Sequence, residues 1–486
     1  MIGLFDDPPV EKIELRAHPQ SREPAPLPPD GALTEGGPPP WTPKDTSDTL
    51  AGLEYDVHLG LRLYHASPLG LINEACGPGG RTFVDHEFCV REGTHLLVDG
   101  RKYAPGIISL QNIADFATSG VPKRVARIKH FLDRARIDGG CGSVDEDVPV
   151  REDSPRWTWK RASSMPGHQL FASDRSIDCR NVIQGRVGNC GFCAGFASLA
   201  AQFPESIRRV FDLEDDGTQT TAESGQGRYG AYAIGIYPEG KRRYLLVDDY
   251  LLCLAGGLDS PSLHSLDERD LWIRVIEKAI VKLQSSYASL DGYYKFNSLW
   301  RHPARAMQLL TGSTVAMEVH LPKNVGVDGV YTVLAKTEGR FARVAHGRKR
   351  INGLHSGHGY SLLWVGEISG VKLACLRNPH GTGSYVGEYG RGDRSFLSDC
   401  ARKVRDELLV GTQRDKGYIS DLLSLNEIRD NGVFLIEFGV FMECFPIVTL
   451  VGPIGEVGLD LAVTNYLHRF RGTVDALEKI LDTRTM

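Results

Sequence analysis

The sequence predicts an α+β protein, and two stretches carry the prediction. An alanine-rich run begins at Cys190, and its apolar residues recur at helical spacing as far as Ala200. Two strand-like runs, residues 360–365 ("YSLLWV") and 371–378 ("VKLACLRN"), flank "GEISG", which is typical of a β-hairpin. A helix and a hairpin are therefore expected in the same folded region.

The composition is that of an ordinary globular protein. The chain has 486 residues, 41% hydrophobic and 24% charged, which is enough for two to four domains. A net charge of −5 gives no electrostatic reason to expect a nucleic-acid partner. The most apolar stretch, residues 433–451, is interrupted by Glu437, Glu443 and Pro446, so buried strands with a helical turn are expected there rather than a membrane span.

The N-terminal sequence and the number of cysteines indicate in which cellular compartment the protein is expected. "MIGLFDDPPVEK" has no basic region followed by an apolar core, so no secretory signal is expected. Ten cysteines are too sparse for a disulfide scaffold in a chain of this length. Reduced thiols and a cytoplasmic location are therefore expected.

The chain is divided by its composition. Residues 1–50 are rich in proline and are expected to form a disordered or polyproline-type tail, with a proline-motif partner as an open alternative. Residues 51–150 form an accessory segment that contains a turn at Asp99–Gly100 and an amphipathic helix at 121–137. A polar, acidic connector follows at 139–155. Continuous globular sequence then runs from Trp157 to about Val451.

"VIQGRVGNC", residues 182–190, places Gln184, glycines and Asn189 just ahead of the predicted helix. Asn189 can cap this helix, which puts Cys190 in its first turn. The unpaired amides and the dipole there favour a thiolate, and a thiolate is the competent nucleophile. The Gln184 amide and a backbone N–H at the helix start can stabilise an oxyanion. Cys193, one turn further along, is expected to be a packing residue.

A thiolate nucleophile needs a histidine that activates it and protonates the leaving amine. Folding the hairpin about residues 368–369 brings His358 and Asn378 opposite each other to within a residue, where Cβ atoms lie roughly 4.5–5.5 Å apart. An asparagine at this place can bond the imidazole and hold its ring toward the cysteine. His355 lies outside the register, in the loop, and His380 is expected to point to the other face.

Several motifs of the chain resemble those of a known protein family. "QGRVGNC" with its small-residue helix, "GHGYSL" and "LRNPHG" are similar to the three catalytic-core motifs of the calpain family of cysteine proteases. Secondary stretches such as "RYLLVDDYL" and "NGVFLIEFGVFMECFPIVTLV" agree in the same order. The resemblance covers about Trp157 to Val451, and an earlier start at "RTFVDHEF", residues 81–88, is open.

The resemblance implies a papain-like fold in two lobes with an N-terminal extension. Residues 151–322 would form a mainly helical lobe, and residues 323–452 a mainly β lobe. Carried over by motif, Cys190 is the nucleophile, His358 the general base and acid, Asn378 the orienting residue and Gln184 the oxyanion donor. Residues 453–486, expected as a helical tail, are too few for the β-sandwich and EF-hand domains of animal calpains.

Two departures from the family concern aromatic residues. The family usually has aspartate-cysteine-tryptophan at the nucleophile, where this chain has Asn189, Cys190 and Gly191. It usually has a second tryptophan where this chain has His380. Two large rings that would shield the site are missing, so a wider or less protected cleft is expected.

A third departure concerns calcium, which animal calpains bind in each lobe through acidic side chains and carbonyls. Asp270 matches one acidic ligand. The other ligand positions hold Asn181, Ser384, Arg391, Arg429, Asn431 and Val433, and a shift of a residue or two would bring in Glu388 or Asp393. Because most of the anionic ligands are absent, we expect no calcium requirement and no other cofactor or metal. The residues ahead of the core are then candidates to brace the lobes or to cover the cleft.

The expected function is that of a calpain-like, calcium-independent cysteine endopeptidase. It would cleave unstructured protein segments through a thioester. An inactive calpain-like scaffold and a papain-fold acyl transferase are the alternatives, although transferases of that kind usually have aspartate in the place of Asn378. A redox or zinc pair of Cys190 and Cys193 is disfavoured, because the sequence has no second C-x-x-C and no thioredoxin-like setting.

Overall fold

The computed structural model describes residues 53–85, Phe88, residues 157–454 and residues 470–472, with gaps inside these ranges. The gaps are at 59–60, 166, 174–175, 186–188, 214–223, 255–259, 261, 285–289, 291–302, 314, 322–325, 384, 391–395, 411–413, 424–429 and 453. The proline-rich tail, the Asp99–Gly100 turn, the helix predicted at 121–137 and the acidic connector lie outside the described residues.

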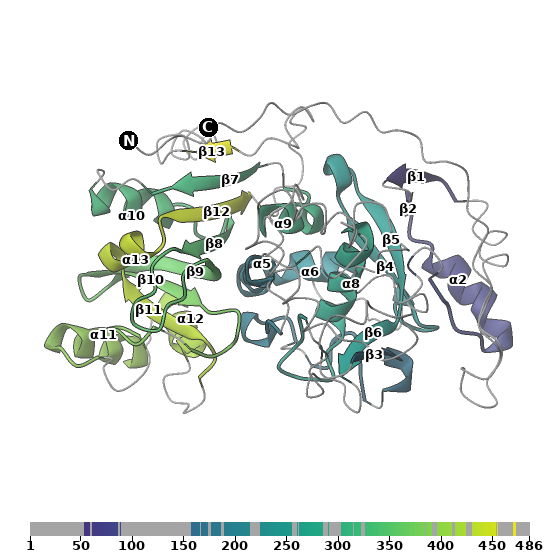
Figure 1. The fold of residues 1–486 in the computed structure, drawn as a ribbon, viewed down its shortest axis with the longest axis horizontal. Helices are drawn as coiled ribbons and strands as arrows, with labels where there is room; N and C mark the ends of the chain where they lie inside the picture. The colour runs from purple at the N-terminus through teal and green to yellow at the C-terminus, as the bar shows by residue number, and fades with distance from the viewer. Residues whose placement is uncertain are drawn as a thin grey trace, which may run out of the picture.

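The described chain forms two lobes side by side (Figure 1). The first lobe holds a four-stranded antiparallel sheet in the order β1-β2-β5-β4 and a separate antiparallel pair, β3 and β6. Its strands are β1 (Tyr55–His58), β2 (Leu61–Tyr64), β3 (Trp157–Arg161), β4 (Ala231–Ile236), β5 (Arg243–Asp248) and β6 (Tyr250–Leu254). Its helices are α2 (Leu69–Cys76), α5 (Cys190–Gln202), α6 (Pro204–Val210) and α8 (Trp272–Gln284), with short 3-10 turns at Gly77–Gly79, Ala162–Ser164, Cys179–Asn181 and Pro238–Gly240.

The second lobe is built on a seven-stranded sheet in the order β11-β10-β9-β8-β12-β7-β13. Its strands are β7 (Val315–His320), β8 (Ala342–Gly347), β9 (His358–Ile368), β10 (Val371–Arg377), β11 (Val433–Glu437), β12 (Ile447–Gly452) and β13 (Phe470–Gly472). Its helices are α10 (Val327–Ala335), α11 (Asp399–Val410), α12 (Arg414–Leu423) and α13 (Phe438–Cys444). β7 lies before residue 323, so this sheet begins earlier than the predicted boundary.

Local sequence explains the elements that frame the site. The apolar stretch at 433–451 folds as strand, helical turn and strand (β11, α13 and β12), as predicted. The hairpin is formed by β9 and β10, but Ile368 pairs with Val371, so its turn is at Ser369–Gly370, one residue later than predicted. Gly370 has φ +79°, which only glycine adopts without strain. In the C-terminal segment that was expected to be helical, residues 470–472 are instead the strand β13, parallel to β7.

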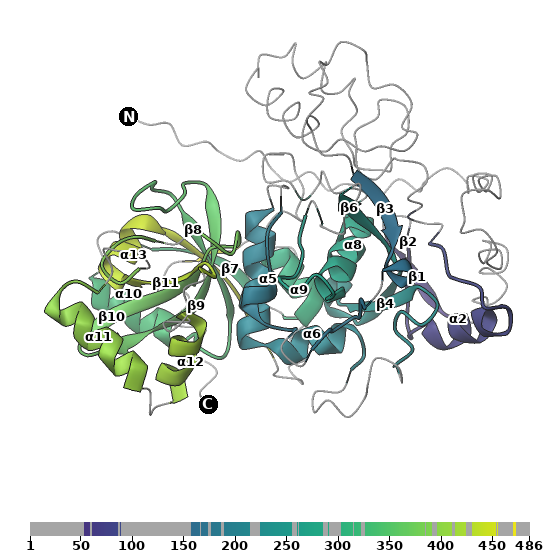
Figure 2. The ribbon, with the colours of Figure 1, turned by 90° about the horizontal axis from the view of Figure 1, so that it is seen from below.

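Helix α5 joins the two lobes. It lies between the first lobe and the large sheet in two perpendicular views (Figures 1 and 2). One hydrophobic core contains Phe196 and Leu199 of α5 together with Val344 and Leu363 of the second lobe. The second helix at this junction is α9 (Pro303–Thr311), which contacts α5 as well as β4, β7 and β12. The lobes are therefore packed on each other through buried side chains.

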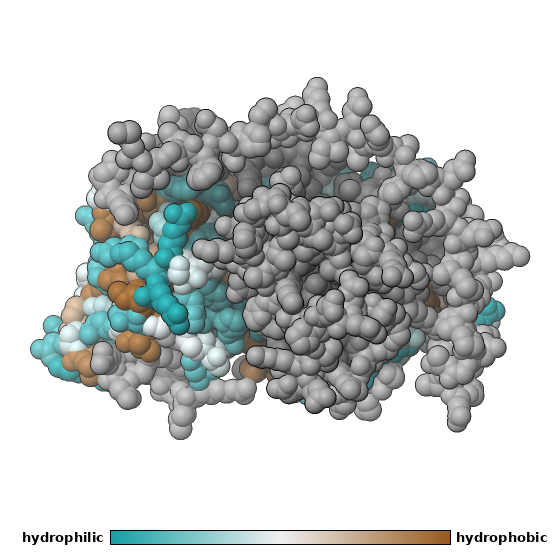
Figure 3. All heavy atoms as spheres, in the orientation of Figure 1, coloured by the Kyte–Doolittle hydropathy of each residue, from teal (hydrophilic) through white to brown (hydrophobic). Residues whose placement is uncertain are grey.

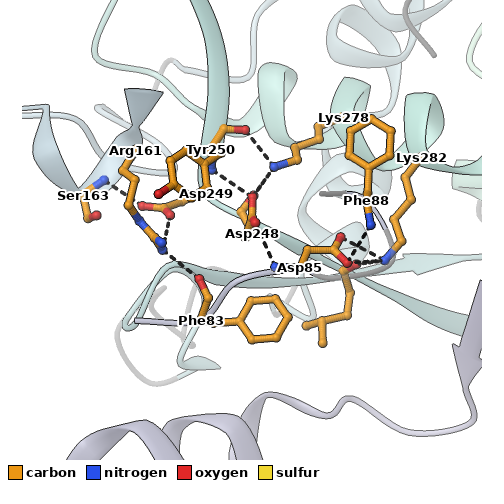
Figure 4. Close-up of polar contacts among 11 residues, drawn as sticks. Phe83, Asp85, Phe88, Arg161, Ser163, Asp248, Asp249, Tyr250, Lys278 and Lys282 are labelled. Atoms are coloured by element: carbon orange, nitrogen blue, oxygen red, sulfur yellow. Dashed lines mark hydrogen bonds and ion pairs between the residues drawn. The ribbon is translucent and has the colours of Figure 1, made fainter. Parts of the chain in front are cut away.

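The described part of the accessory segment is folded onto the first lobe, on the side away from the large sheet (Figures 1 and 2). The Nζ of Lys282 lies 2.9 Å from Oδ2 of Asp85, and the two side chains are 1% and 3% exposed. The N–H of Asp85 donates to Asp248 (2.8 Å), and Arg161 donates to the carbonyl of Phe83 (2.9 Å) (Figure 4). The expectation that the segment ahead of the core braces the lobes or covers the cleft stays a prediction, because residues 89–156 lie outside the described residues.

The surface of the second lobe is mixed. Hydrophobic and polar residues are interspersed over its described part in the view of Figure 3. None of the helices in the described ranges is both long and apolar enough to cross a membrane.

Candidate active site

Cys190 is the first residue of α5, as the sequence predicted. Residues Phe192 to Ala200 of this helix are all buried, which is why the run needs small side chains. Cys190 itself is partly exposed. Its Sγ lies 3.4 Å from the backbone nitrogen of Gly359, which comes from β9 of the other lobe. A thiol is thus placed at the start of a helix and at the boundary between the lobes.

Cys193 is fully buried, which confirms that it is a packing residue. Burial raises the pKa of its thiol far above the ordinary value, so it stays protonated at neutral pH. Its Sγ faces the carbonyl groups of Val182 and Pro379 at 3.9 Å. Of the two thiols in the motif, Cys190 is the one that a reagent can reach.

Asn189 stands at the N-cap position, but its side chain does not cap the helix, contrary to the prediction. Its Nδ2 instead donates to Ser262 (3.0 Å) and to Glu277 of α8 (3.1 Å). Burial raises the pKa of Glu277 to about 8, although hydrogen bonds from Ser262, Leu263 and Asn189 oppose the shift. Glu277 lies 88 residues from Asn189 in the sequence, so no local pattern links it to the site.

His358 and Asn378 are brought together by the hairpin. His358 is the first residue of β9, and Asn378 directly follows β10. Nε2 of His358 lies 3.0 Å from Oδ1 of Asn378. The pair is not directly opposed, because the turn lies later than predicted, and a bulge between Cys375 and Leu376 moves the register only part of the way back. The side chains meet from neighbouring positions instead.

The amide of Asn378 has a fixed orientation. Its Nδ2 donates to the carbonyl groups of Thr382 (2.9 Å) and Gly383 (3.0 Å). Its Oδ1 must therefore face His358, and it also accepts the N–H of His380 (3.1 Å). A carbonyl oxygen can only accept, so Nε2 of His358 carries the proton of the neutral ring and Nδ1 carries the lone pair.

His358 has two other imidazole rings against it. The His380 ring stacks on it, with centroids 5.0 Å apart and planes at 8°, which corrects the expectation that His380 points to the other face. The ring of His355, in the loop before β9 as predicted, meets it edge-on at 5.7 Å. The backbone turns after Asn378, with the N–H of Gly381 donating to the carbonyl of Asn378 (3.0 Å), so His380 does not follow the alternation of an extended strand. Burial, with smaller contributions from His380 and His355, lowers the pKa of His358 to about 4.

Gln184 lies on the first-lobe side of the same site. Its side chain is buried, and its backbone N–H donates to the carbonyl of Pro379 (2.8 Å). Pro379 is the residue after Asn378. The segment that carries Gln184 is therefore hydrogen-bonded to the turn that carries Asn378.

The residues matched to calcium ligands are engaged with protein groups. Asp270 is 1% exposed and accepts from the N–H of Ala172 and the hydroxyl groups of Ser176 and Ser265. Asn181 donates to the carbonyl of Ser176. An amide and a carboxylate with three protein donors do not fit a calcium site, which needs several free oxygen ligands.

In the second lobe, the described residues at the positions matched to calcium ligands also form hydrogen bonds with protein groups. Asn431 accepts from the N–H of Val433 and donates to Leu422, and Glu388 accepts from the N–H of Ser398. Ser384, Arg391, Asp393 and Arg429 lie outside the described residues. Across the described part of the chain, no group of three or more His, Cys, Asp or Glu side chains is arranged to hold a metal ion.

Comparison with known proteins identifies related sequences. Residues 143–449 match the family model described as calpain family cysteine protease. The chain is 28% identical to human calpain-12 over 68% of its own length and 42% of that protein. It is 24% identical to rat calpain-9 (71% of this chain, 47% of that protein) and 27% identical to the rice calpain-type cysteine protease ADL1 (46% and 10%). The chain thus spans less than half the length of each of these relatives.

Proposed function

Because the chain belongs to the calpain family of cysteine proteases, with a papain-like α+β core, we propose that it is a cysteine endopeptidase. The observation that carries the proposal is the orientation of the Asn378 amide. It holds Nε2 of His358 as a donor and so keeps Nδ1 as the base. Cys190, at the adjoining helix start, is the nucleophile.

The proposed reaction has two halves. The Cys190 thiol gives its proton to Nδ1 of His358, and the sulfur attacks the peptide carbonyl carbon. The C–N bond breaks as the imidazolium gives that proton to the leaving amine, which leaves a thioester. Water then attacks the thioester while His358 takes one of its protons, and the released thiolate recovers that proton. His358 must therefore become a cation twice in each cycle.

The carbonyl oxygen becomes an anion in each half of the reaction, and we assign its stabilisation to Gln184 and the backbone at the start of α5. The bond from Gln184 N–H to the carbonyl of Pro379 supports this assignment, because it ties this donor to the Asn378 turn. Gln184 and Asn378 would then be positioned together when the lobes meet.

We also propose that activity does not require calcium. Two observations support calcium independence. The polar side chains at the described ligand positions are hydrogen-bonded to protein groups, and the two lobes contact each other directly. C-terminal to Cys190 in α5, two residues contact the second lobe. Ser361 donates to the carbonyl of Ala194 (2.8 Å), and the N–H of Arg343 donates to the hydroxyl of Ser198 (2.8 Å). N-terminal to Cys190, the carbonyls of Val182 (2.8 Å) and Arg180 (3.2 Å) accept hydrogen bonds from the fully buried Arg377 of the second lobe. These contacts can hold the assembled arrangement without an ion.

The natural substrates are proposed to be unstructured protein segments in the cytoplasm. An extended segment can enter a site between two lobes, whereas a folded domain cannot. The proline-rich residues 1–50 remain a candidate ligand for a proline-recognising partner domain.

The direct experiment incubates the purified chain with casein in chelator and in millimolar calcium, and identifies the products by mass spectrometry. We expect internal cleavage in both conditions, lost in Cys190→Ala and kept in Cys193→Ser. Intact casein in all samples would indicate an inactive scaffold. Acyl transfer to an added amine without hydrolysis would indicate a transferase. Cleavage in calcium alone would overturn the calcium proposal but leave the peptidase.

A further inference from the structure

The stacked ring of His380 occupies the position at which the sequence suggested a missing shield. His380 is more exposed to solvent than His358. With the ring planes at 8° and the centroids 5.0 Å apart, His380 covers one face of His358. The shield is therefore present as a flat ring, but it is one that can take up a proton.

The backbone fixes this stacking. Residues 378–381 form a turn closed by the N–H of Gly381, which donates to the carbonyl of Asn378 (3.0 Å). Pro379 restricts φ in the turn, and Gly381 has φ +70°. The N–H of His380 donates to the same Asn378 Oδ1 that faces His358. The turn that orients Asn378 thus also places His380.

We propose that His380 is a positioning residue whose protonation switches hydrolysis off: as a neutral ring it covers His358, and as a cation it opposes the positive charge that His358 acquires. This inference rests on the proposed function, since it concerns the proton that His358 takes from Cys190. It makes hydrolysis dependent on pH in a way that a tryptophan at this position could not, because an indole ring takes up no proton in this range.

The described titratable groups next to His380 are His358 at the start of β9, which stacks on it, and His355 in the loop before β9, which affects its pKa. Cys190 of α5 adjoins Gly359, the residue after His358. Partial burial and the proximity of His355 lower the pKa of His380 below its ordinary value. His380 is thus neutral at pH 7. It becomes a cation only on acidification.

The size of the effect follows from the separation of the rings. Two unit charges about 5 Å apart, in an effective dielectric between that of water and that of a protein surface, change an equilibrium by about 4-fold to a few hundredfold. We therefore expect acidification to lower kcat/KM by about tenfold or more as His380 becomes charged. The loss should appear in kcat/KM and kcat, with KM little changed, because substrate binding is not altered.

The experiment compares pH profiles of the full chain and three variants. His380→Trp keeps a flat ring without a proton site, His380→Gln keeps neither ring nor charge, and His355→Phe is the matched control at the edge-on imidazole. Peptide hydrolysis gives kcat/KM from pH 4.5 to 8. Alkylation of Cys190 by iodoacetamide, located by mass spectrometry, gives the reactivity of the thiol without a substrate.

We expect the acid limb to move to lower pH in both His380 variants, so that on the acid limb of the parent they keep about tenfold more of their pH 7.5 activity than the parent does. In His355→Phe the limb should stay or move to higher pH, because loss of that neighbour raises the pKa of His380. Coincident profiles for the parent and the His380 variants would overturn the inference while leaving the peptidase intact. If no peptide is hydrolysed, the proposed function fails, and the alkylation profiles alone decide whether His380 controls Cys190.

Discussion

Nε2 of His358 and Oδ1 of Asn378 lie 3.0 Å apart, and the rest of the site is organised around this contact. The Asn378 amide is held from behind by two carbonyl groups, so it cannot rotate to present its NH₂. It thereby sets the tautomer of the His358 ring. A contact between two side chains 20 residues apart thus leaves the lone pair on Nδ1, the atom that the proposed mechanism uses as the base.

Asn378→Ala should lower kcat/KM and leave it measurable. The change removes the group that orients His358 but leaves both reacting groups, so the loss should be smaller than that in His358→Ala or Cys190→Ala. Peptide hydrolysis by the three variants at pH 7.5 gives the ranking. Asn378→Ala as inactive as Cys190→Ala would mean that orientation alone decides activity. An Asn378→Ala variant with full activity would remove Asn378 from the site.

Gly359→Ala should lower activity strongly, whereas Gly191→Ala should not. A Cβ at Gly359 would lie 2.9 Å from Cα of Gly191, so the first turn of α5 would have to separate from β9. A Cβ at Gly191 would meet only Pro303, at the ordinary distance of 3.5 Å. Displacement by a fraction of an ångström to 1 Å at Cys190 lowers rates by up to about 10²-fold. Equal kcat/KM for the two variants would show that this close approach does not position the thiol.

Lys282→Met should lower the free energy of unfolding by about 3–5 kcal/mol, because it leaves the buried Asp85 carboxylate without its cation. Lys349→Met is the control: its pair with Glu443 is 52% and 71% exposed, so a change within about 0.5 kcal/mol is expected. Urea unfolding followed by tryptophan fluorescence measures both.

A chain that starts at residue 154 lacks Asp85, β1, β2 and α2 altogether, and should be less stable still. Equal unfolding midpoints for the 154 chain and the full chain would contradict the structural role of this segment.

Calcium should not raise the melting temperature of the chain. A site with Kd near 50 μM would add about 2.7 kcal/mol at one hundred times that concentration, which thermal unfolding detects readily. Asp270→Asn should lower the melting temperature in chelator, since the carboxylate that accepts from Ala172, Ser176 and Ser265 is lost. An increase of several degrees with calcium in the parent, absent in Asp270→Asn, would show that Asp270 is a ligand after all.

The sequence predicted those features that depend on local pattern. The helix at Cys190 and the β9–β10 hairpin follow from side-chain spacing, and both are present. The hairpin turn was predicted one residue too early, because the positive φ of Ser369, a residue other than glycine, has no strong signal in the sequence. The bulge after Cys375 has no signal in the sequence either. The partner of Asn189 was missed for another reason. A lone asparagine before a helix predicts a cap, and only tertiary packing brings Glu277 close enough to compete.

The position of His380 shows the same limit in the functional site. From the sequence, its replacement of a tryptophan suggested a missing shield. Only the turn at 378–381 shows that the imidazole takes the shielding position itself. The Asp85–Lys282 pair, 197 residues apart, was equally invisible before folding.

The central claim is that Cys190, activated by His358, is the nucleophile of the assembled site without calcium. An epoxysuccinyl peptide, which alkylates activated protease thiols, tests it most directly when added in chelator and followed by intact-mass and peptide mass spectrometry. We expect one adduct per chain, on Cys190, absent in His358→Ala although the thiol remains. An adduct on the exposed Cys400, or on Cys190 equally in His358→Ala, would contradict the account, because it would show reactivity without the His358 base.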